Sequence, residues 1–220
     1  MHLIQKPATL IGAAMNNRRR FLLSAFAVMA LFASGFAAPV ADTPGQEMTV
    51  ELDPVQTTVA FTLGDVLHTV HGSFRLKSGT IHFNPTTGAA SGLVVVDVTS
   101  GDTGNKSRDR KMHREILESA KYPEATFTPN KVSGQFNPQG ASTVEVSGIF
   151  RLHGGDHPVV MTFPISLNGS TMTMTTHMVI PYVKWGLKNP STFILRVSDK
   201  LNLDINATGH MVATQASVAK

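Results

Sequence analysis

Two pairs of closely spaced histidines, His68 with His71 and His153 with His157, are the side chains of this 220-residue sequence best suited to holding a metal ion. A zinc site needs three or four nitrogen, sulfur or carboxylate ligands around one ion. The sequence has no cysteine, and no neighbouring glutamate completes either pair. His153 precedes Gly154 in a predicted turn, where its ring would hydrogen-bond within the turn. We therefore expect no metal and no other cofactor, and keep a histidine metal site as an alternative.

The residue types of nucleophilic and acid–base catalysis are present but follow no catalytic pattern. The sequence has no Gly-x-Ser-x-Gly motif, in which a strand-to-helix turn exposes a nucleophilic serine. No pair of carboxylates has a spacing typical of general acid–base catalysis. The lack of cysteine also excludes thiolate nucleophiles and disulfides. These observations favour a binding protein over an enzyme.

Arg108, Asp109 and Tyr122 are polar residues that could contact a ligand from the end of a sheet. Arg108 and Asp109 follow a turn and lie in a short charged helix predicted around residues 106–119. They could grip a polar head group, or form an ion pair that holds the helix in place. Tyr122 precedes Pro123, whose fixed φ suits the start of a strand, so that the tyrosine ring packs at the rim. Arg108 and Tyr122 are therefore candidate ligand contacts.

Most of the sequence after Gln46 alternates apolar and polar residues, which is the pattern of strands with one buried face. The clearest stretches are residues 59–63, 144–152, 159–167, 172–178 and 201–205. Turns are predicted at Asn84-Pro85, Asn137-Pro138, Gly154-Gly155 and Asn168-Gly169. Only residues 106–119 place apolar side chains, Met112, Ile116 and Leu117, on one helical face.

These elements predict an all-β fold, an antiparallel barrel of about eight strands with one short flanking helix. A two-sheet sandwich is the alternative, but a closed barrel leaves no exposed sheet edge. The interior of an eight-stranded barrel is either filled by side chains or holds one small ligand.

Strand parity assigns a set of apolar side chains to the interior of such a barrel. The methionines among them are flexible and would leave adaptable space, although all these side chains could simply pack against one another. Burial is worth about 0.8 kcal/mol per methylene, whereas association costs about 4–15 kcal/mol, so an apolar ligand must have a long chain. The predicted lining residues are Phe61, Leu63, Val70, Phe74, Val94, Val96, Val98, Phe127, Phe150, Leu152, Val159, Met161, Phe163, Met172, Met174 and Met178.

Residues 1–41 are predicted to be an export leader. Arg18, Arg19 and Arg20 precede an apolar run at residues 21–36, which is shorter than the about 20 residues of a spanning helix. Gly35 and Ala37 suit a signal-peptidase site, so we expect a cleaved signal peptide, a periplasmic protein and no stable membrane insertion afterwards. Residues 17–23 resemble a twin-arginine motif, with the general secretory route as the alternative. Met15 is an alternative start of translation.

The basic character of the full chain comes from this leader. The chain has 19 Lys+Arg and 15 Asp+Glu. Removing residues 1–41 takes away Lys6 and the three arginines and no acidic residue, so residues 42–220 hold 15 of each. A formally neutral domain is a poor partner for nucleic acid. Roughly 180 residues suffice for one domain with a single core.

Four stretches, in this order and spacing, resemble the YceI family of bacterial periplasmic proteins. Together they cover residues 48–207, and the sequence departs from the family pattern at Asp65 and at residues 111–117. The stretches are residues 61–79 with Val70-His71-Gly72-Ser73-Phe74; Ser100-Gly101-Asp102-Thr103-Gly104-Asn105 followed by Arg108-Asp109, Tyr122-Pro123 and Phe127; residues 148–154 followed by His157-Pro158-Val159; and Trp185-Gly186-Leu187.

The resemblance implies a lipocalin-like barrel over residues 42–220 that binds a long isoprenoid-type lipid, such as a quinone or a polyprenyl compound, as a periplasmic carrier or store. The departures affect the expected head-group contacts more than the barrel. A homodimer is a further expectation from the resemblance. One alternative is a filled barrel that acts through its surface as a stress-related interaction protein, and the other is the histidine metal binder.

Overall fold

Nine antiparallel strands form one sheet in the computed structural model, which describes residues 47–64, 69–193 and 196–212. The predicted leader, residues 1–41, lies outside these ranges, as do Asp65 and His68. The strands are β1 (Met48–Leu52), β2 (Thr58–Gly64), β3 (Thr69–Phe83), β4 (Ala90–Asp102), β5 (Glu124–Gln135), β6 (Ala141–Leu152), β7 (Gly155–Asn168), β8 (Thr171–Ile180) and β9 (Leu201–Val212).

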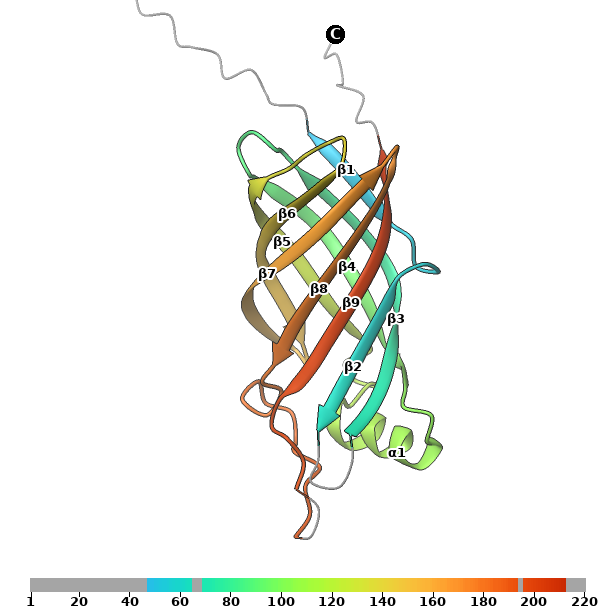
Figure 1. Cartoon of the computed structure of the whole chain (residues 1–220). Helices are drawn as coiled ribbons and strands as arrows, with labels where there is room; N and C mark the ends of the chain where they lie inside the picture. The colour runs from blue at the N-terminus through green and yellow to red at the C-terminus, as the bar shows by residue number, and fades with distance from the viewer. Residues whose placement is uncertain (1–46, 65–68, 194–195, 213–220) are drawn as a thin grey trace, which may run out of the picture. The chain divides into compact units, whose positions relative to one another are not determined.

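The sheet closes on itself into a barrel (Figure 1). Neighbouring strands run in the order β3-β2-β9-β8-β7-β6-β5-β4, and β4 pairs again with β3. β1 and β2 both lie between β3 and β9 and together fill one strand position. β1 pairs with β3 near Ile81 and with β9 near Met211, whereas β2 pairs with β3 near Gly72 and with β9 near Leu203. The described residues therefore form eight strand positions, which confirms the predicted closed antiparallel barrel and rules out the sandwich.

The predicted turn residues lie where the strands reverse. The Oδ1 atom of Asn84 accepts hydrogen bonds from the backbone N–H groups of Thr86 and Thr87, at 2.9 Å and 3.0 Å. His153 and Gly154 join β6 to β7 with positive φ angles of 52° and 79°. Two successive positive φ angles are the geometry of the type I′ turn, whose twist matches that of a two-stranded hairpin.

Two irregularities change which side chains face the interior. The register of β3 against β4 shifts between Leu76 and Ser78, and that of β5 against β6 shifts between Pro129 and Lys131. An extra residue at such a bulge reverses the alternation of faces beyond it. Val70 and Phe74 therefore share the interior of β3 with odd-numbered residues from its other end, as the cavity described below shows.

β7 and β8 are paired over only part of their length. The pairing joins Ile165 through Asn168 to Thr171 through Met174, whereas β8 pairs with β9 as far as Ile180. Towards the end of the barrel where α1 lies, the two strands separate (Figure 1). Thr176 lies on this separated part of β8, and its buried Oγ1 atom has no hydrogen-bond partner.

The predicted flanking helix is present and covers one end of the barrel. Helix α1 (Lys106–Lys111) continues as the π-helical turn η1 (Met112–Ile116). The side chain of Asn105 caps α1 by accepting hydrogen bonds from the backbone N–H groups of Ser107 and Arg108. Among the described residues, no helix has both the length and the apolar character needed to cross a membrane.

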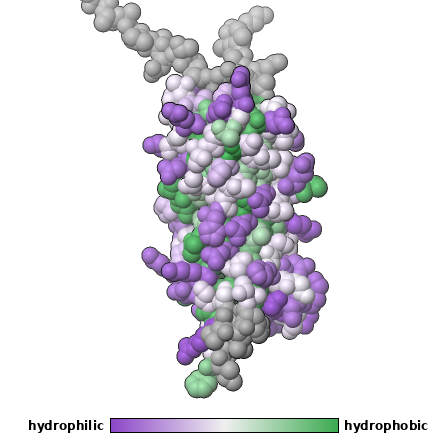
Figure 2. Space-filling model, viewed as in Figure 1, coloured by the Kyte–Doolittle hydropathy of each residue, from purple (hydrophilic) through white to green (hydrophobic). Residues whose placement is uncertain are grey.

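The apolar residues of the sheet gather inside the barrel. The buried cluster draws side chains from every strand, including Val50, Phe61, Phe127, Met161 and Leu203. Figure 2 shows that the outer face seen in this view is mostly polar, with apolar residues scattered over it. The alternation of residue types in the strands therefore separates an apolar interior from a polar exterior.

Candidate ligand-binding cavity

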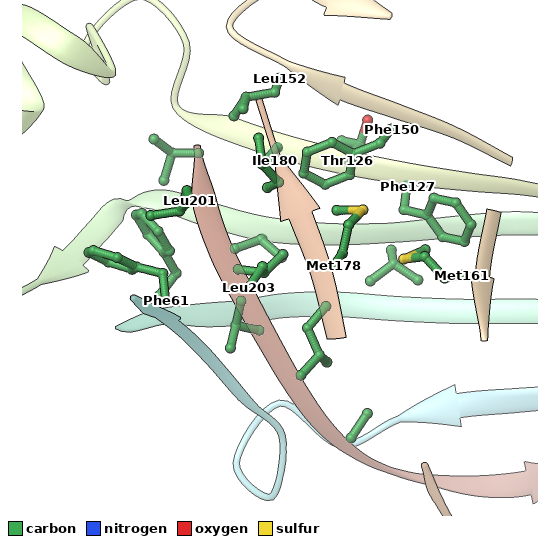
Figure 3. Close-up of a pocket in the computed structure, with 18 of the residues that line it drawn as sticks. Phe61, Thr126, Phe127, Phe150, Leu152, Met161, Met178, Ile180, Leu201 and Leu203 are labelled. Carbon is green, nitrogen blue, oxygen red and sulfur yellow. The ribbon is translucent and has the colours of Figure 1, made fainter. Parts of the chain in front are cut away.

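The inward faces of the strands enclose a cavity of about 520 Å³. This volume lies within the roughly 300–1,000 Å³ typical of small-molecule sites in proteins. Every strand from β1 to β9 contributes lining side chains, and Figure 3 shows Phe61, Phe150, Met178 and Leu203 around the same space. The interior is therefore not filled by its own side chains, which was the alternative prediction for a barrel of this size.

The structure brings together nearly all the side chains that strand parity assigned to the interior. Arg108 also lines the cavity, at its helix end. The predicted residues found in the lining are Phe61, Leu63, Val70, Phe74, Val94, Val96, Val98, Arg108, Phe127, Phe150, Leu152, Met161, Phe163, Met172, Met174 and Met178.

Val159 and Tyr122 are the two predicted residues that do not line the cavity. Val159 lies opposite Gly148 on the neighbouring strand and packs against the buried cluster. Tyr122 packs on the ring of His153, with 4.3 Å between the ring centroids. Tyr122 is half-buried and packs against the β6–β7 hairpin, and its side chain does not line the cavity.

Several lining residues were not included in the prediction. The alternation in β9 was visible in the sequence, and the apolar face of the helix was too, but neither was assigned to the cavity. Ile81 and Phe83 were missed because the bulge in β3 reverses their parity. The additional lining residues include Val50, Leu52, Val59, Ile81, Phe83, Thr126, Phe136, Ile180, Leu201, Leu203, Ile205, Ala207, Met112, Ile116 and Leu117.

Aromatic side chains line the end of the cavity away from α1. Phe83 and Phe136 pack edge to face there, with 5.2 Å between their ring centroids and an interplanar angle of 77°. Edge-to-face packing is a favourable arrangement of two aromatic rings. Both rings line the cavity and contribute apolar surface to this end of it.

The opposite end of the cavity, here called the mouth, reaches the protein surface. Ser107, Arg108 and Lys111 of α1 line it and are exposed. The segment 181–200, which connects β8 to β9, contributes Leu187 and Pro190. An apolar interior with hydroxyl and cationic groups at one opening suits a molecule with a long apolar tail and a polar head.

Arg108 and Asp109 both bind Thr103 and form no ion pair with each other among the described contacts. Arg108 donates from Nε to Thr103 Oγ1 at 2.8 Å, and from Nη2 to the Thr103 carbonyl oxygen at 2.9 Å. The backbone N–H and the hydroxyl of Thr103 donate to Asp109 Oδ1, at 2.9 Å and 2.6 Å. The pair therefore holds the start of α1 against the end of β4, while the Arg108 guanidinium stays at the mouth.

Asp109 is only 6% exposed, yet it remains ionised at neutral pH. Burial raises the pKa of its carboxyl group, but the hydrogen bonds from Thr103, together with the charges of Lys106 and Arg108, lower this pKa further. The net effect is a pKa below the ordinary value, and Asp109 Oδ2 is buried without a partner. The carboxylate therefore stabilises the attachment of α1 to Thr103 through the hydrogen bonds that Oδ1 accepts.

The described histidines of the two pairs occupy separate environments. His153 Nε2 lies 2.8 Å from Glu118 Oε2, a contact between segments that are distant in sequence. His157 stacks on Trp185, with 3.9 Å between centroids and 4° between the planes. Burial lowers the pKa of His157. Within the described ranges, no group of three His, Cys, Asp or Glu side chains could hold a metal ion, and His68 lies outside them.

Residues 51–209 match the sequence profile of the YceI-like domain family. The chain belongs to the YceI-like family. A UPF0312 protein of Vibrio cholerae is 30% identical over 138 residues, which is 61% of this chain and 67% of that protein. Protein YceI of Escherichia coli is 31% identical over 94 residues, 42% of this chain, so the match spans 47% of that relative.

Two solved structures share the barrel fold. BcnA of Burkholderia cenocepacia superposes with a TM-score of 0.59 at 19% identity, over 71% of this chain and 98% of BcnA. A polyisoprenoid-binding domain from Saccharophagus degradans superposes with a TM-score of 0.57 at 18% identity, over 74% of this chain and 98% of that domain. At these identities the comparison establishes the fold.

Proposed function

We propose that this YceI-like protein binds a long isoprenoid-type lipid, such as a quinone or a polyprenyl compound, in its barrel and serves as a periplasmic carrier or store. The observation that carries the proposal is the cavity of about 520 Å³ with an almost wholly apolar wall. Thr126 is the polar side chain among those labelled in Figure 3, and the cationic groups are confined to the mouth. Such a lining stabilises a hydrocarbon tail and repels a charged one.

The cavity volume supports a tail of intermediate to long length. A water-sized group occupies roughly 30 Å³ in a liquid, so the cavity has room for on the order of 15–20 carbon atoms. Ten buried carbons would contribute about 8 kcal/mol, which the cost of association largely offsets. Twenty would contribute about 16 kcal/mol and leave a dissociation constant near the micromolar range.

Two further observations support the ligand class and the compartment. The Saccharophagus degradans domain with the same fold is described as polyisoprenoid-binding. The arginine cluster and apolar run in residues 18–36 have the order of an export signal. From the first observation we infer that this chain binds an isoprenoid tail, and from the second that it is exported to the periplasm.

The test uses the fluorescence of Trp185, the sole tryptophan of the chain. Trp185 packs on Phe150, which lines the cavity, with 5.9 Å between centroids. Titration with geraniol, farnesol, geranylgeraniol and solanesol, and with a prenylated quinone as a quencher, should give affinities that rise with tail length and then level off. Equal affinities for all tails, or no binding of any, would contradict the proposal.

Native mass spectrometry of protein isolated from the periplasm tests the same proposal without a chosen probe. The expected result is a mass increment that organic extraction removes and that corresponds to a prenyl lipid. Protein that is recovered empty, and that takes up no prenyl lipid afterwards, would refute the proposed function. Failure to recover the protein from the periplasm would refute the proposed compartment alone.

A further inference from the structure

The positive charge of the protein is concentrated around the mouth. Two of the segments at this opening are residues 102–121, which contain α1, and residues 183–200, which lie between β8 and β9. Together they carry ten Lys and Arg residues and five Asp and Glu residues. Residues 42–220 as a whole hold 15 of each, so the rest of this region carries a matching excess of negative charge. The barrel is therefore basic at its open end.

Several of these basic side chains are exposed and have no carboxylate within 4 Å among the described residues. They are Arg110, Lys111, Lys184, Lys188, Arg196 and Lys200. Glu115 is already bound to Arg114 at 2.6 Å. Its pKa is lowered by that hydrogen bond first and also by the charges of Arg114, Lys111 and Lys188, so basic residues of both segments act on the same carboxylate.

A large apolar side chain projects from the same end. Phe193 is 95% exposed. Its segment is held by internal hydrogen bonds, since Ser191 Oγ accepts from the backbone N–H of Val197 at 2.8 Å and Tyr182 donates to the Ser198 carbonyl oxygen at 2.6 Å. Val183, in the same segment, is 36% exposed. A phenyl ring exposed at this position is available to bury its apolar surface in the boundary layer of a lipid bilayer.

We propose that the mouth of the barrel docks onto the surface of a membrane that contains anionic phospholipids, with Phe193 inserted among the lipids and Lys184 and Lys188 against their head groups. The inference rests on the proposed function, because docking places the opening of a lipid carrier against the source of its ligand. An exposed aromatic residue among cations is the combination that binds such an interface. Figure 2 shows the barrel wall in this view as mostly polar, with apolar residues scattered over it.

The expected loss of vesicle binding can be worked out separately for the basic side chains and for the aromatic ring. Each Lys or Arg near an anionic bilayer surface is worth about 1 kcal/mol, or roughly a fivefold change in affinity. The double variant Lys184→Glu with Lys188→Glu should therefore bind vesicles at least about 25-fold more weakly. Phe193→Ser should weaken binding at least about tenfold, through the lost burial of its ring. Binding should also fall steeply as salt screens the charges.

The experiment is co-sedimentation of the intact protein with vesicles of phosphatidylethanolamine and phosphatidylglycerol, compared with vesicles of phosphatidylcholine. Val55→Ser is the matched control for the aromatic variant, because Val55 is 92% exposed in the β1–β2 connection. Lys131→Glu on β5 is the control for charge. Both controls should bind the anionic vesicles like the unaltered protein.

The proposal is supported if the anionic vesicles bind the protein and the mouth variants bind them more weakly than the controls do. It is overturned if the unaltered protein ignores these vesicles, if it binds phosphatidylcholine equally well, or if the mouth variants bind unchanged. Retention on an acidic protein instead of the vesicles would overturn it too. Uptake of farnesol from solution, measured by Trp185 fluorescence, should be unchanged in Lys184→Glu with Lys188→Glu, so a failure of docking is distinguishable from a failure of lipid binding.

Discussion

Replacement of Ala207 by phenylalanine asks whether the space inside the barrel is open to a ligand. Ala207 lies on β9 opposite Met174, is 5% exposed, and lines the cavity. A phenyl ring at this position would extend into the cavity. The change adds no polar group and leaves the backbone pairing of β8 with β9 intact.

The sign of the stability change separates an open cavity from a packed core. A buried phenylalanine side chain contributes about 1.5–3 kcal/mol relative to an exposed one. A well-packed core would instead lose about 1–3 kcal/mol through overpacking. Because the cavity measures about 520 Å³, we expect Ala207→Phe to raise the free energy of unfolding of the empty protein by about 1–2 kcal/mol.

The same substitution should weaken ligand binding. A ring that displaces about four carbons of a bound tail removes about 3 kcal/mol of burial, which corresponds to roughly 100-fold in affinity. Urea denaturation of lipid-free protein measures the first effect, and Trp185 quenching by a prenylated quinone measures the second. Val160→Phe is the matched control, since Val160 lies on the outer face of β7 and is 64% exposed.

Two outcomes would refute this reasoning. Overpacking costs about 1–3 kcal/mol. A fall in the free energy of unfolding of about 1 kcal/mol or more would therefore mean that the cavity offers no space for a ring beside Ala207. Unchanged quinone affinity in a stably folded Ala207→Phe protein would place the bound tail somewhere other than this cavity.

Three further predictions address single side chains. Met161→Glu should abolish prenyl-lipid uptake or folding, because it buries an unpaired charge in the cavity lining. Val160→Glu on the outer face should bind the lipid normally. Normal uptake by Met161→Glu would show that the assignment of Met161 to the inner face is wrong. Thr176→Val should raise the free energy of unfolding in urea by about 1 kcal/mol, since it removes a buried hydroxyl without a partner, and a loss of stability would indicate an unseen partner. The pKa of Asp109 is lowered in the folded state, so its stabilising contribution is present above the ordinary aspartate pKa and is lost as the pH falls through the folded-state value. Asp109→Asn should therefore make the free energy of unfolding less sensitive to acid between neutral pH and pH about 3. An unchanged pH profile of stability would argue against the role assigned to Thr103.

The alternation of residue types predicted the strands and most of the cavity lining, and it left a closed barrel and a two-sheet sandwich as the possible architectures. Phe61, Phe150 and Met174 belong to strands in which apolar and polar residues largely alternate, and a strand presents alternate side chains to one face. The helix was predictable for a similar reason, because Met112 and Ile116 lie on one helical face. These features are local, so a single sequence contains them.

Features that depend on contacts between distant segments were not predictable in this way. The shared position of β1 and β2 and the bulge near Leu76 are properties of strand pairing, and the bulge brings Phe83 into the cavity. Tyr122 was expected to contact a ligand, but its ring packs on His153 of the β6–β7 hairpin and does not line the cavity.

The sequence alone therefore determined that the strands would each present one apolar face to a common interior, because periodicity depends only on the order of residues along a strand. The pairing of β3 with β4, which closes the sheet, was decided by the tertiary structure. The tertiary structure decided that those faces leave space between them, and that the Arg108 and Asp109 side chains meet at Thr103. Cavity volume is the difference between the space a barrel encloses and the side chains that enter it. That difference depends on strand register and on the placement of every inward residue at once.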